Sequence, residues 1–439
     1  MRTAPVNIPL EAAMVHTEET TVAISGGGPA GITLGLLLAR AGVDVTVLEK
    51  HGDFLRDFRG DTVHPSTLEL LDELGLAEEM ERLPHRKVTT VTVGNAEQPI
   101  VAADLGDLPG KYHYVAMTPQ WDFLEMLTRH AARYPTFNLL MNSESTGLIE
   151  EDGAVRGLTY TTRAADGTDT GEQHRLRAVL TVSAEGRRSD LRGAAGMVPR
   201  DLGAPMDVVW LQVPRDPGTA EGFNGRLGAG AIGVAIDRGD FWQVGYVIPK
   251  GGLDEIRSQP ISALQDRLLE LLPFLGERVR EVDDWQQVAF LEVGLNRLTR
   301  WHRTGLLCIG DAAHTMTPVG GVGINLAVQD AVAAANLLAD PLFEAQQDPD
   351  RFGKTLNPEL LERVQRRRQV PTVGTQAIQW LLQRQVISRA LAEDPTPPPL
   401  LRLVAGTRAW SRLVGRVMMQ GIRPEHVQTP ERAPAFAEG

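Results

Sequence analysis

The N-terminal part of the chain alternates short apolar runs with one longer apolar stretch. β-branched and apolar residues predict strands at Thr21–Ser25 and Val43–Leu48, and the apolar stretch between them has the length of a helix. Gly26, Gly28 and Gly31 stand between the first strand and the helix in a GxGxxG pattern. A strand, a glycine cluster, a helix and a second strand in this order indicate a βαβ unit that binds a dinucleotide.

Each glycine of this pattern has a separate use. Gly26 permits a tight turn, Gly28 the close approach of a diphosphate, and Gly31 close packing of the helix on the strand. The amides at the start of the helix then face the diphosphate. Glu49 ends the second strand, and we expect its carboxylate to accept both hydroxyls of an adenosine ribose and to repel a 2′-phosphate.

The same glycine spacing occurs again in different surroundings. Gly228, Gly230 and Gly233 also match GxGxxG, but a strand-like segment follows them where a dinucleotide site needs a helix. We therefore predict that this second match is a turn between two strands.

A further glycine cluster lies far downstream, after a second buried-strand pattern. The run Leu306–Ile309 ends in Gly310-Asp311, and after Pro318 three glycines open a long helix of small and apolar residues. A cofactor with a ribityl chain and a tricyclic ring would use both features, Asp311 for a ribityl hydroxyl and the positive helix end near Gly323–Asn325 for the electron-rich flavin edge. This second site favours FAD over NAD.

Three motifs in order carry a resemblance to a known family. GGGPAG, then AEGRRSDLR at Ala184–Arg192, then GDAAHTMTPVGGVGIN resemble the group A flavin-dependent monooxygenases, the single-component aromatic hydroxylases similar to para-hydroxybenzoate hydroxylase. The resemblance runs from about Thr20 to about Ala339. Glu185 replaces the aspartate usual in the middle motif, and two interpretations stay open: a cofactor contact, or an ion pair with a neighbouring arginine that shapes the turn.

The resemblance implies a bound FAD, NADH or NADPH as a transient reductant, dioxygen as co-substrate, and oxygen transfer through a flavin C4a-hydroperoxide. It also implies catalytic roles for Arg59, beside flavin and nicotinamide, and for Pro318, beside the oxygen position. Together with the glycine patterns it indicates the cofactor-binding residues Gly26, Gly28, Gly31, Glu49, Arg59, Gln120, Asp311, Gly321, Gly323, Ile324 and Asn325.

The implied architecture is α/β, with a Rossmann-like FAD-binding domain, an interleaved β-sheet substrate domain and a helical C-terminal region. We assign 1–19 to a disordered tail, 20–86, 113–196 and 294–343 to the FAD-binding domain, 87–112 and 197–293 to the substrate-binding sheet, and 344–439 to the helical region. Helices are predicted at Pro358–Arg368, Thr372–Leu391 and Leu400–Met419. Their arginine-rich amphipathic face fits packing on the rest of the chain, with a membrane-surface role as the alternative.

The predicted substrate sheet has aromatic and amide residues near alternating spacing. The candidates to line the pocket are His64, Trp210, Gln212, Trp242 and Tyr246. An imidazole near neutral pH can accept the proton of a phenol. Aromatic alternation in a sheet is also typical of ordinary core, and both interpretations stay open. His314, next to the Gly-Asp motif, is expected to be structural.

Composition narrows the possible partners. The chain has 439 residues, with 44 lysines and arginines against 56 acidic residues, which argues against nucleic-acid binding and favours a small-molecule partner. The resemblance implies that this partner is a small aromatic substrate. The single cysteine, Cys308, fits a cytoplasmic protein and cannot build a disulfide within the chain. The histidines lack metal-ligand spacing, and we find no uninterrupted apolar run of membrane-spanning length. We therefore expect no metal and no stable membrane insertion, and an oligomer is possible.

We therefore expect an FAD-dependent hydroxylase of an apolar aromatic or polyketide-like substrate. A prenyl-lipid or quinone-pathway hydroxylase or reductase of the same fold is an alternative, and so is a non-catalytic lipid-binding scaffold. A flavin halogenase is disfavoured because FWQVGYVIPK lacks the paired tryptophans of that class. The exact substrate, the regiochemistry and the choice between NADH and NADPH are not determined by the sequence.

Overall fold

The computed structural model describes residues 17–55, 62–94, 99–106, 108–164, 168–216, 218, 222–228, 230–391, 407, 412 and 415–432. Its main body is an eight-stranded sheet in which β1 (Thr17–Ser25), β2 (Val45–Leu48), β8 (Phe137–Leu140), β11 (Asp169–Ser183) and β20 (Leu306–Cys308) run parallel. β19 (His302–Arg303) flanks β20, while β9 (Ser143–Glu151) and β10 (Ala154–Arg163) form an antiparallel extension of β11. The predicted α/β class is correct.

The first strand begins earlier than the sequence pattern indicated. Thr17–Glu19, which we expected in a disordered tail, pair with Arg175–Arg177 of β11. The reason is tertiary, since the long β11 offers backbone partners beyond the apolar run of β1. The rest of the predicted tail lies outside the described residues.

Helices α1 (Pro29–Arg40), α4 (Gln120–Ala131) and α8 (Gly323–Ala345) pack together against the main sheet. α1 is buried along nearly its whole length because its sequence is apolar on all sides. The stretch Val319–Ala345 is, among the described residues, the one helical stretch long and apolar enough to cross a bilayer, but 78% of its most apolar window is buried inside the fold.

A second, seven-stranded sheet has the order β17-β13-β16-β15-β14-β5-β6. β13 (Met206–Pro214), β16 (Phe241–Pro249) and β15 (Ala231–Asp237) are its antiparallel centre, and β5 (Thr90–Gly94) pairs in parallel with β14 (Phe223–Gly228). Two distant chain segments therefore build one sheet. The glycine cluster near Gly228 and Gly230 is the turn between β14 and β15, so this prediction is correct.

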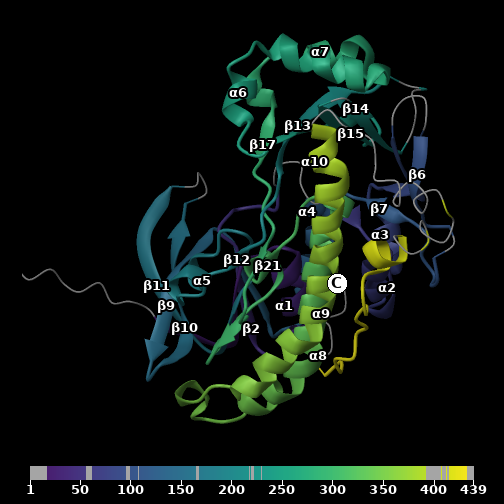
Figure 1. Cartoon of the computed structure of the whole chain (residues 1–439). Coiled ribbons are helices and arrows are strands. Elements are labelled where there is room, and N and C mark those ends of the chain that lie inside the picture. Colours follow the sequence, from purple (N-terminus) through teal and green to yellow (C-terminus); the bar gives the residue numbers. More distant parts are fainter. Residues whose placement is uncertain are drawn as a thin grey trace, which may run out of the picture.

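The C-terminal helices depart from the prediction. α9 (Pro358–Leu382) is continuous through Pro371, and its continuation, the π-helical turn η6 (Gln383–Ile387) and α10 (Ser388–Leu391), reaches the second sheet. Figure 1 shows this long helix running along the molecule from α8 up to the second sheet. Only the end of the third predicted helix is described, as the π-helical turn η7 (Arg416–Gln420).

The remaining elements are β3 (Thr62–Val63), β4 (Arg86–Val88), β6 (Pro99–Asp104), β7 (Val115–Met117), β12 (Arg200–Asp201), β17 (Ala289–Leu291), β18 (Asn296–Arg297), β21 (His314–Thr315), α2 (Pro65–Glu73), α3 (Ala77–Arg82), α5 (Asp190–Ala194), α6 (Leu253–Arg257), α7 (Ile261–Leu271) and the 3-10 turns η1 (Pro273–Glu281), η2 (Trp285–Gln287), η3 (Gly310–Ala312), η4 (Val319–Gly321) and η5 (Arg351–Gly353). β3, β7 and β4 form one small sheet, and β12, β18 and β21 form another.

Candidate active site

The glycine turn after β1 has the geometry that a dinucleotide needs. Gly26 has a φ of +107°, and a Cβ there would lie 2.4 Å from the carbonyl oxygen of Ala184. A Cβ on Gly31 would lie 1.9 Å from the carbonyl oxygen of Gly26. Gly28 differs, because it caps α1 and has open space within 4 Å of its Cβ position. Two glycines are thus required by backbone packing, and the third leaves an uncapped helix start free for a phosphate group.

Glu49 stands beside this turn at the end of β2. Its side chain is 9% exposed, and its Oε2 accepts a hydrogen bond of 3.0 Å from the Gly27 amide. Its Oε1 accepts from the amide of His51 at 3.1 Å and contacts His51 Nδ1 at 2.6 Å. This arrangement fixes the carboxylate beside the glycine turn, where we predicted its contact with a ribose.

The second half of the site is the turn Gly310–Ala312 after β20. Asp311 is partly exposed, and its Oδ2 accepts from Arg187 Nε at 3.3 Å. Behind it, buried Asp330 accepts from the Gly310 amide at 3.1 Å and from Arg368 Nε at 2.9 Å. Asp330 Oδ2 also lies 2.6 Å from His314 Nε2. His314 therefore has the structural role that we expected.

This buried cluster also explains how the Gly310 turn is held. Burial by itself would raise the pKa of Asp330, but His314 and Arg368 outweigh it and keep this pKa below its ordinary value. The ionised carboxylate orients the Gly310 amide, and with it the position of Asp311. The network continues to the C-terminal segment, where Glu425 lies 3.5 Å from Arg368 Nη1.

Residues 318–325 form what we call the floor of the site. Gly320 and Gly321 have positive φ angles of +79° and +63°, which favour glycine. The first turn of α8 follows with Gly323, Ile324 and Asn325, and no side chain among the described residues caps it. Its backbone amides are therefore available to a negatively polarised ligand edge.

The side chain of Asn325 has a bracing role that the sequence did not indicate. Its Oδ1 accepts from Ser66 Oγ at 2.9 Å and from Thr67 Oγ1 at 2.7 Å, which ties the start of α2 to α8. Thr62 Oγ1 similarly donates to the carbonyl oxygen of Gly321 at 2.8 Å. The backbone of the floor is held in place by side chains of the β3–α2 region.

α9 supplies further positioning residues that sequence reasoning missed. Gln379 accepts from the Thr317 amide at 3.2 Å and donates to the carbonyls of Thr317 and Val319 at 3.0 and 2.8 Å. Gln376 and Gln383 hold Thr315 and Thr317 in the same way. These glutamines follow one another at helical spacing, and this spacing is the signal that could have identified them. They fix the segment that carries Pro318.

Glu185 does not form the ion pair that we considered for it. Its carboxylate accepts hydrogen bonds from Ser25 Oγ at 3.0 Å, from Ser183 Oγ at 3.1 Å, from Ser189 Oγ and from the Leu191 amide. The neighbouring arginines pair elsewhere, with Asp311 and Glu292. Burial raises the pKa of Glu185, and the four donors offset part of this rise. Its observed role is to join the ends of β1 and β11 beside the glycine turn.

Two predicted residues remain less defined. Arg59 lies outside the described residues, although Thr62, three residues later, is bonded to the floor. Gln120 is the first residue of α4, directly after β7 and Pro119. Both assignments stay predictions.

The second sheet divides the predicted pocket residues between its two faces. Trp242 and Tyr246 pair across the strands with Val213 and Val209, and all four pack beneath α7 and η1. Trp242 is 1% exposed and meets Phe274 edge to face at 5.2 Å. Trp242 and Tyr246 thus lie in a core on the α7 side of the sheet, because alternate residues of a strand point to opposite faces, and their place in the pocket stays a prediction.

Trp210 and Gln212 lie on the other face. Trp210 pairs with Gly245, where a Cβ would lie 2.9 Å from the indole ring, so the glycine makes room for it. The indole packs against a cluster between the second sheet and the floor, which we call the interdomain cluster. The buried members of this cluster are Val88, Leu105, Leu108, Val115, Met117, Ile236, Met316, Val322, Leu326, Met418 and Met419.

His64 adjoins the interdomain cluster from the FAD side. It is 1% exposed, and among the described residues neither ring nitrogen has a partner with hydrogen-bond geometry. Burial lowers the pKa of His64 from 6.5 to about 4, although backbone groups of Met418, Met419 and Gly320 near the ring partly oppose this effect. The ring is therefore neutral at physiological pH. The indole Nε1 of Trp210 is also buried and has no hydrogen-bond partner in the part of the chain that the structure describes.

The glycine turn after β1 with Glu49, the Gly310–Asp311 turn and the floor together fit an extended FAD. The comparison with protein families agrees with this interpretation. The family model of the FAD binding domain matches residues 19–349. The chain belongs to this family, and within it to the group A FAD-dependent aromatic hydroxylases, which are monooxygenases. The alternative of a non-catalytic scaffold is thereby excluded.

Particular relatives extend the comparison over nearly the whole chain. A 6-methylpretetramide 4-monooxygenase from Streptomyces rimosus is 31% identical over 401 residues, which cover 91% of this chain and 92% of the relative. The OxyS anhydrotetracycline hydroxylase from Streptomyces rimosus matches with a TM-score of 0.70 at 20% identity, covering 91% of this chain and 76% of that one. PqsL, a probable FAD-dependent monooxygenase from Pseudomonas aeruginosa, matches with a TM-score of 0.68 at 20% identity. This match covers 85% of this chain and 98% of PqsL. At this identity the two structures show a shared fold.

Proposed function

We propose that this protein is an NAD(P)H-using monooxygenase that hydroxylates an activated ring carbon of an apolar aromatic or polyketide-like substrate. When bound, FAD supplies hydride acceptance and the transfer of one atom of dioxygen by the C4a route expected of the family. The substrate would bind between Trp210 and the floor. The observation that carries the proposal is the interdomain cluster, a set of buried apolar side chains that packs between the second sheet and the floor.

The composition of the interdomain cluster supports a large, flat substrate. Four of the eleven methionines of the chain, Met117, Met316, Met418 and Met419, belong to it. Methionine side chains are flexible and polarisable, so they repack around a ligand at a lower cost than branched side chains do. The relative named as a 6-methylpretetramide 4-monooxygenase supports the polyketide-like class.

Two unpaired polar groups at the cluster are suited to orient such a substrate. The unprotonated ring nitrogen of neutral His64 would accept a hydrogen bond from a substrate hydroxyl, and Trp210 Nε1 would donate one to a substrate oxygen. Buried polar atoms without partners are costly, and a ligand that pairs both would recover that free energy. The apolar surroundings would keep water from the reacting carbon.

The first test is a screen of substrates for stimulated NAD(P)H oxidation by the FAD-loaded protein. We expect polycyclic phenols to accelerate oxidation and to gain one oxygen atom from ¹⁸O₂, measured by mass spectrometry. p-Hydroxybenzoate serves as the small hydrophilic control. Stimulation and hydroxylation restricted to the small acid would contradict the proposed substrate class and its location.

The roles proposed for Arg59 and Pro318 separate in two measurements. Arg59→Ala should slow anaerobic reduction of the flavin in stopped-flow experiments, because a guanidinium suits the nicotinamide phosphates. Pro318→Ala should leave reduction unchanged and raise the share of reducing equivalents lost as hydrogen peroxide. If Pro318→Ala slows reduction alone and keeps full coupling, the assignment of Pro318 to the oxygen side is wrong.

A further inference from the structure

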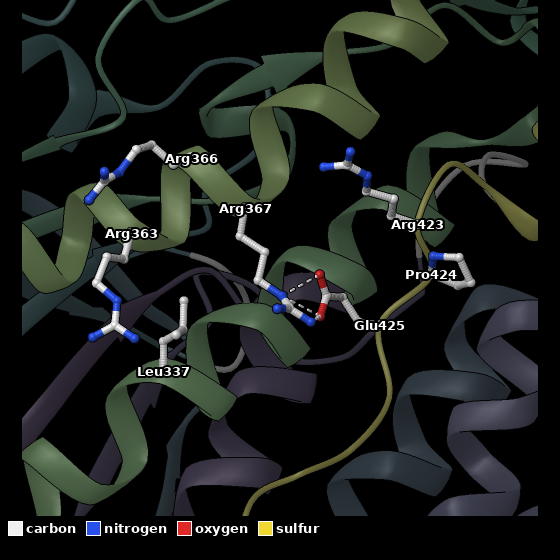
Figure 2. A pocket seen from close by; sticks show the side chains of 7 residues that line it. All are labelled: Leu337, Arg363, Arg366, Arg367, Arg423, Pro424 and Glu425. Atoms are coloured by element: carbon white, nitrogen blue, oxygen red, sulfur yellow. Dashed lines mark hydrogen bonds and ion pairs between the residues drawn. The ribbon is translucent and has the colours of Figure 1, made fainter.

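A cavity of about 620 Å³ opens between α8, α9 and the C-terminal segment 421–432. Leu337 lines it from α8, three arginines from α9, and Arg423, Pro424 and Glu425 from the C-terminal segment (Figure 2). Leu337 lies fourteen residues along α8 from Gly323, a distance of about 21 Å at 1.5 Å per residue. The cavity is therefore separate from the floor.

Its lining is strongly basic, although the chain as a whole is acidic. Arg363, Arg366, Arg367 and Arg423 face a single glutamate, on a protein whose formal net charge is −12. Positions 363, 366 and 367 share one face of α9, where like charges repel one another. Such a concentration of positive charge is stabilised when an anion neutralises it.

Two of these four arginines have no counterpart within the described chain. Arg367 donates to both oxygens of Glu425, at 2.9 and 2.8 Å, as the dashed lines in Figure 2 mark. Arg366 lies 3.8 Å from the exposed Glu362. Among the described residues, no ion pair or hydrogen bond of the side chain reaches Arg363 or Arg423. Two guanidinium groups therefore remain for a ligand.

The position of Arg423 is set by its neighbours along the chain. Its backbone has a φ of +54°, a left-handed conformation that is costly for a residue with a side chain. Downstream, Glu425 is held by Arg367 and Arg368, and the amide of Val427 donates to Glu73 at 2.7 Å. The segment thus presents the Arg423 guanidinium opposite α9 at the expense of local strain.

We propose that this arginine cavity is a binding site for a phosphorylated anion, of the diphosphate class. Guanidinium groups bind phosphate oxygens in a bidentate manner. The four arginines around this cavity carry more positive charge than its single glutamate neutralises. The proposal does not depend on which substrate is hydroxylated. The phosphate groups come either from a nicotinamide dinucleotide or from another phosphorylated small molecule.

The experiment is calorimetric titration of the full-length, FAD-loaded protein with inorganic pyrophosphate, so that the cofactor already fills its own diphosphate site. We expect saturable binding that weakens as salt is added. Arg363→Gln combined with Arg423→Gln should weaken it at least tenfold. The matched control, Arg82→Gln with Arg129→Gln, removes two exposed arginines elsewhere and should leave it unchanged. If the double variant loses its FAD or its fold, Arg366→Gln replaces it, with an expected severalfold loss.

Parallel titrations with NADPH and NADH identify the source of the phosphate. If the arginine variants weaken the binding of pyrophosphate, NADPH and NADH alike, the diphosphate of a nicotinamide dinucleotide is the natural ligand group. If they weaken pyrophosphate binding and leave both dinucleotides unaffected, the ligand is another phosphorylated molecule. Absence of saturable pyrophosphate binding by the unmodified protein, or equal binding by the arginine variants, would overturn the proposal.

Discussion

The two faces of the second sheet predict opposite consequences for two tryptophans. Trp242 is 1% exposed, lies under α7 and η1, and contacts Phe274. Replacing such a buried tryptophan by alanine removes its transfer free energy and leaves a cavity, at a cost of about 3–5 kcal/mol. Trp242→Ala should therefore destabilise the fold by at least two powers of ten in the folding equilibrium, while the protein that remains folded keeps its substrate response.

Trp210→Ala should behave in the reverse way. Trp210 is only half-buried and faces the interdomain cluster, so its removal costs less stability and removes the surface on which an aromatic ring would stack. We expect urea-unfolding midpoints from far-UV circular dichroism to fall mainly for Trp242→Ala. Substrate-stimulated NAD(P)H oxidation, normalised to bound FAD, should fall mainly for Trp210→Ala.

The comparison has a clear refuting outcome. A Trp242→Ala protein with an unchanged unfolding midpoint and a lost substrate response would place Trp242 in the pocket and would invalidate the assignment of faces. Equal losses in both variants would mean that the sheet transmits damage from one face to the other, and the pocket could then not be located in this way.

Three further predictions concern the FAD-binding part. Gly28→Val should fold, because open space surrounds this Cβ position, but it should copurify with little FAD, whereas Gly31→Ala should fail to fold. A normal ratio of flavin to protein absorbance in Gly28→Val would exclude the proposed position of the phosphate. Asp330→Asn takes from buried Arg368 its carboxylate partner at 2.9 Å and leaves it the more distant Glu425, at 3.5 Å, so it should cost about 3 kcal/mol in urea unfolding; a loss below about 1 kcal/mol would contradict this account. The pKa of His64 is about 4 in the fold and 6.5 in the unfolded chain, so between these pH values the unfolded state binds more protons than the folded state. The free energy of unfolding should therefore rise by up to about 3 kcal/mol from pH 4 to 6.5, and His64→Gln should remove that rise.

The sequence alone was sufficient for the local parts of the site. Gly26, Gly28 and Gly31 with Glu49 lie within one βαβ unit, where strand, turn and helix follow one another and the geometry depends on near neighbours. The Gly310–Asp311 turn and the start of α8 could be predicted for the same reason. Glycines with positive φ or forbidden Cβ positions leave a recognisable spacing, and apolar periodicity predicts the elements around them.

Only the tertiary structure decided which groups meet across the fold. The face to which Trp210 and Trp242 point depends on which side α7 covers, and alternation along a strand defines two faces without choosing between them. Gln379 of α9 holds Thr317, and Arg368 holds Asp330, through contacts between segments far apart in the chain. The arginine cavity likewise exists because the C-terminal segment returns across α9. Such pairings arise from packing of whole elements, so no pattern within a single element contains them.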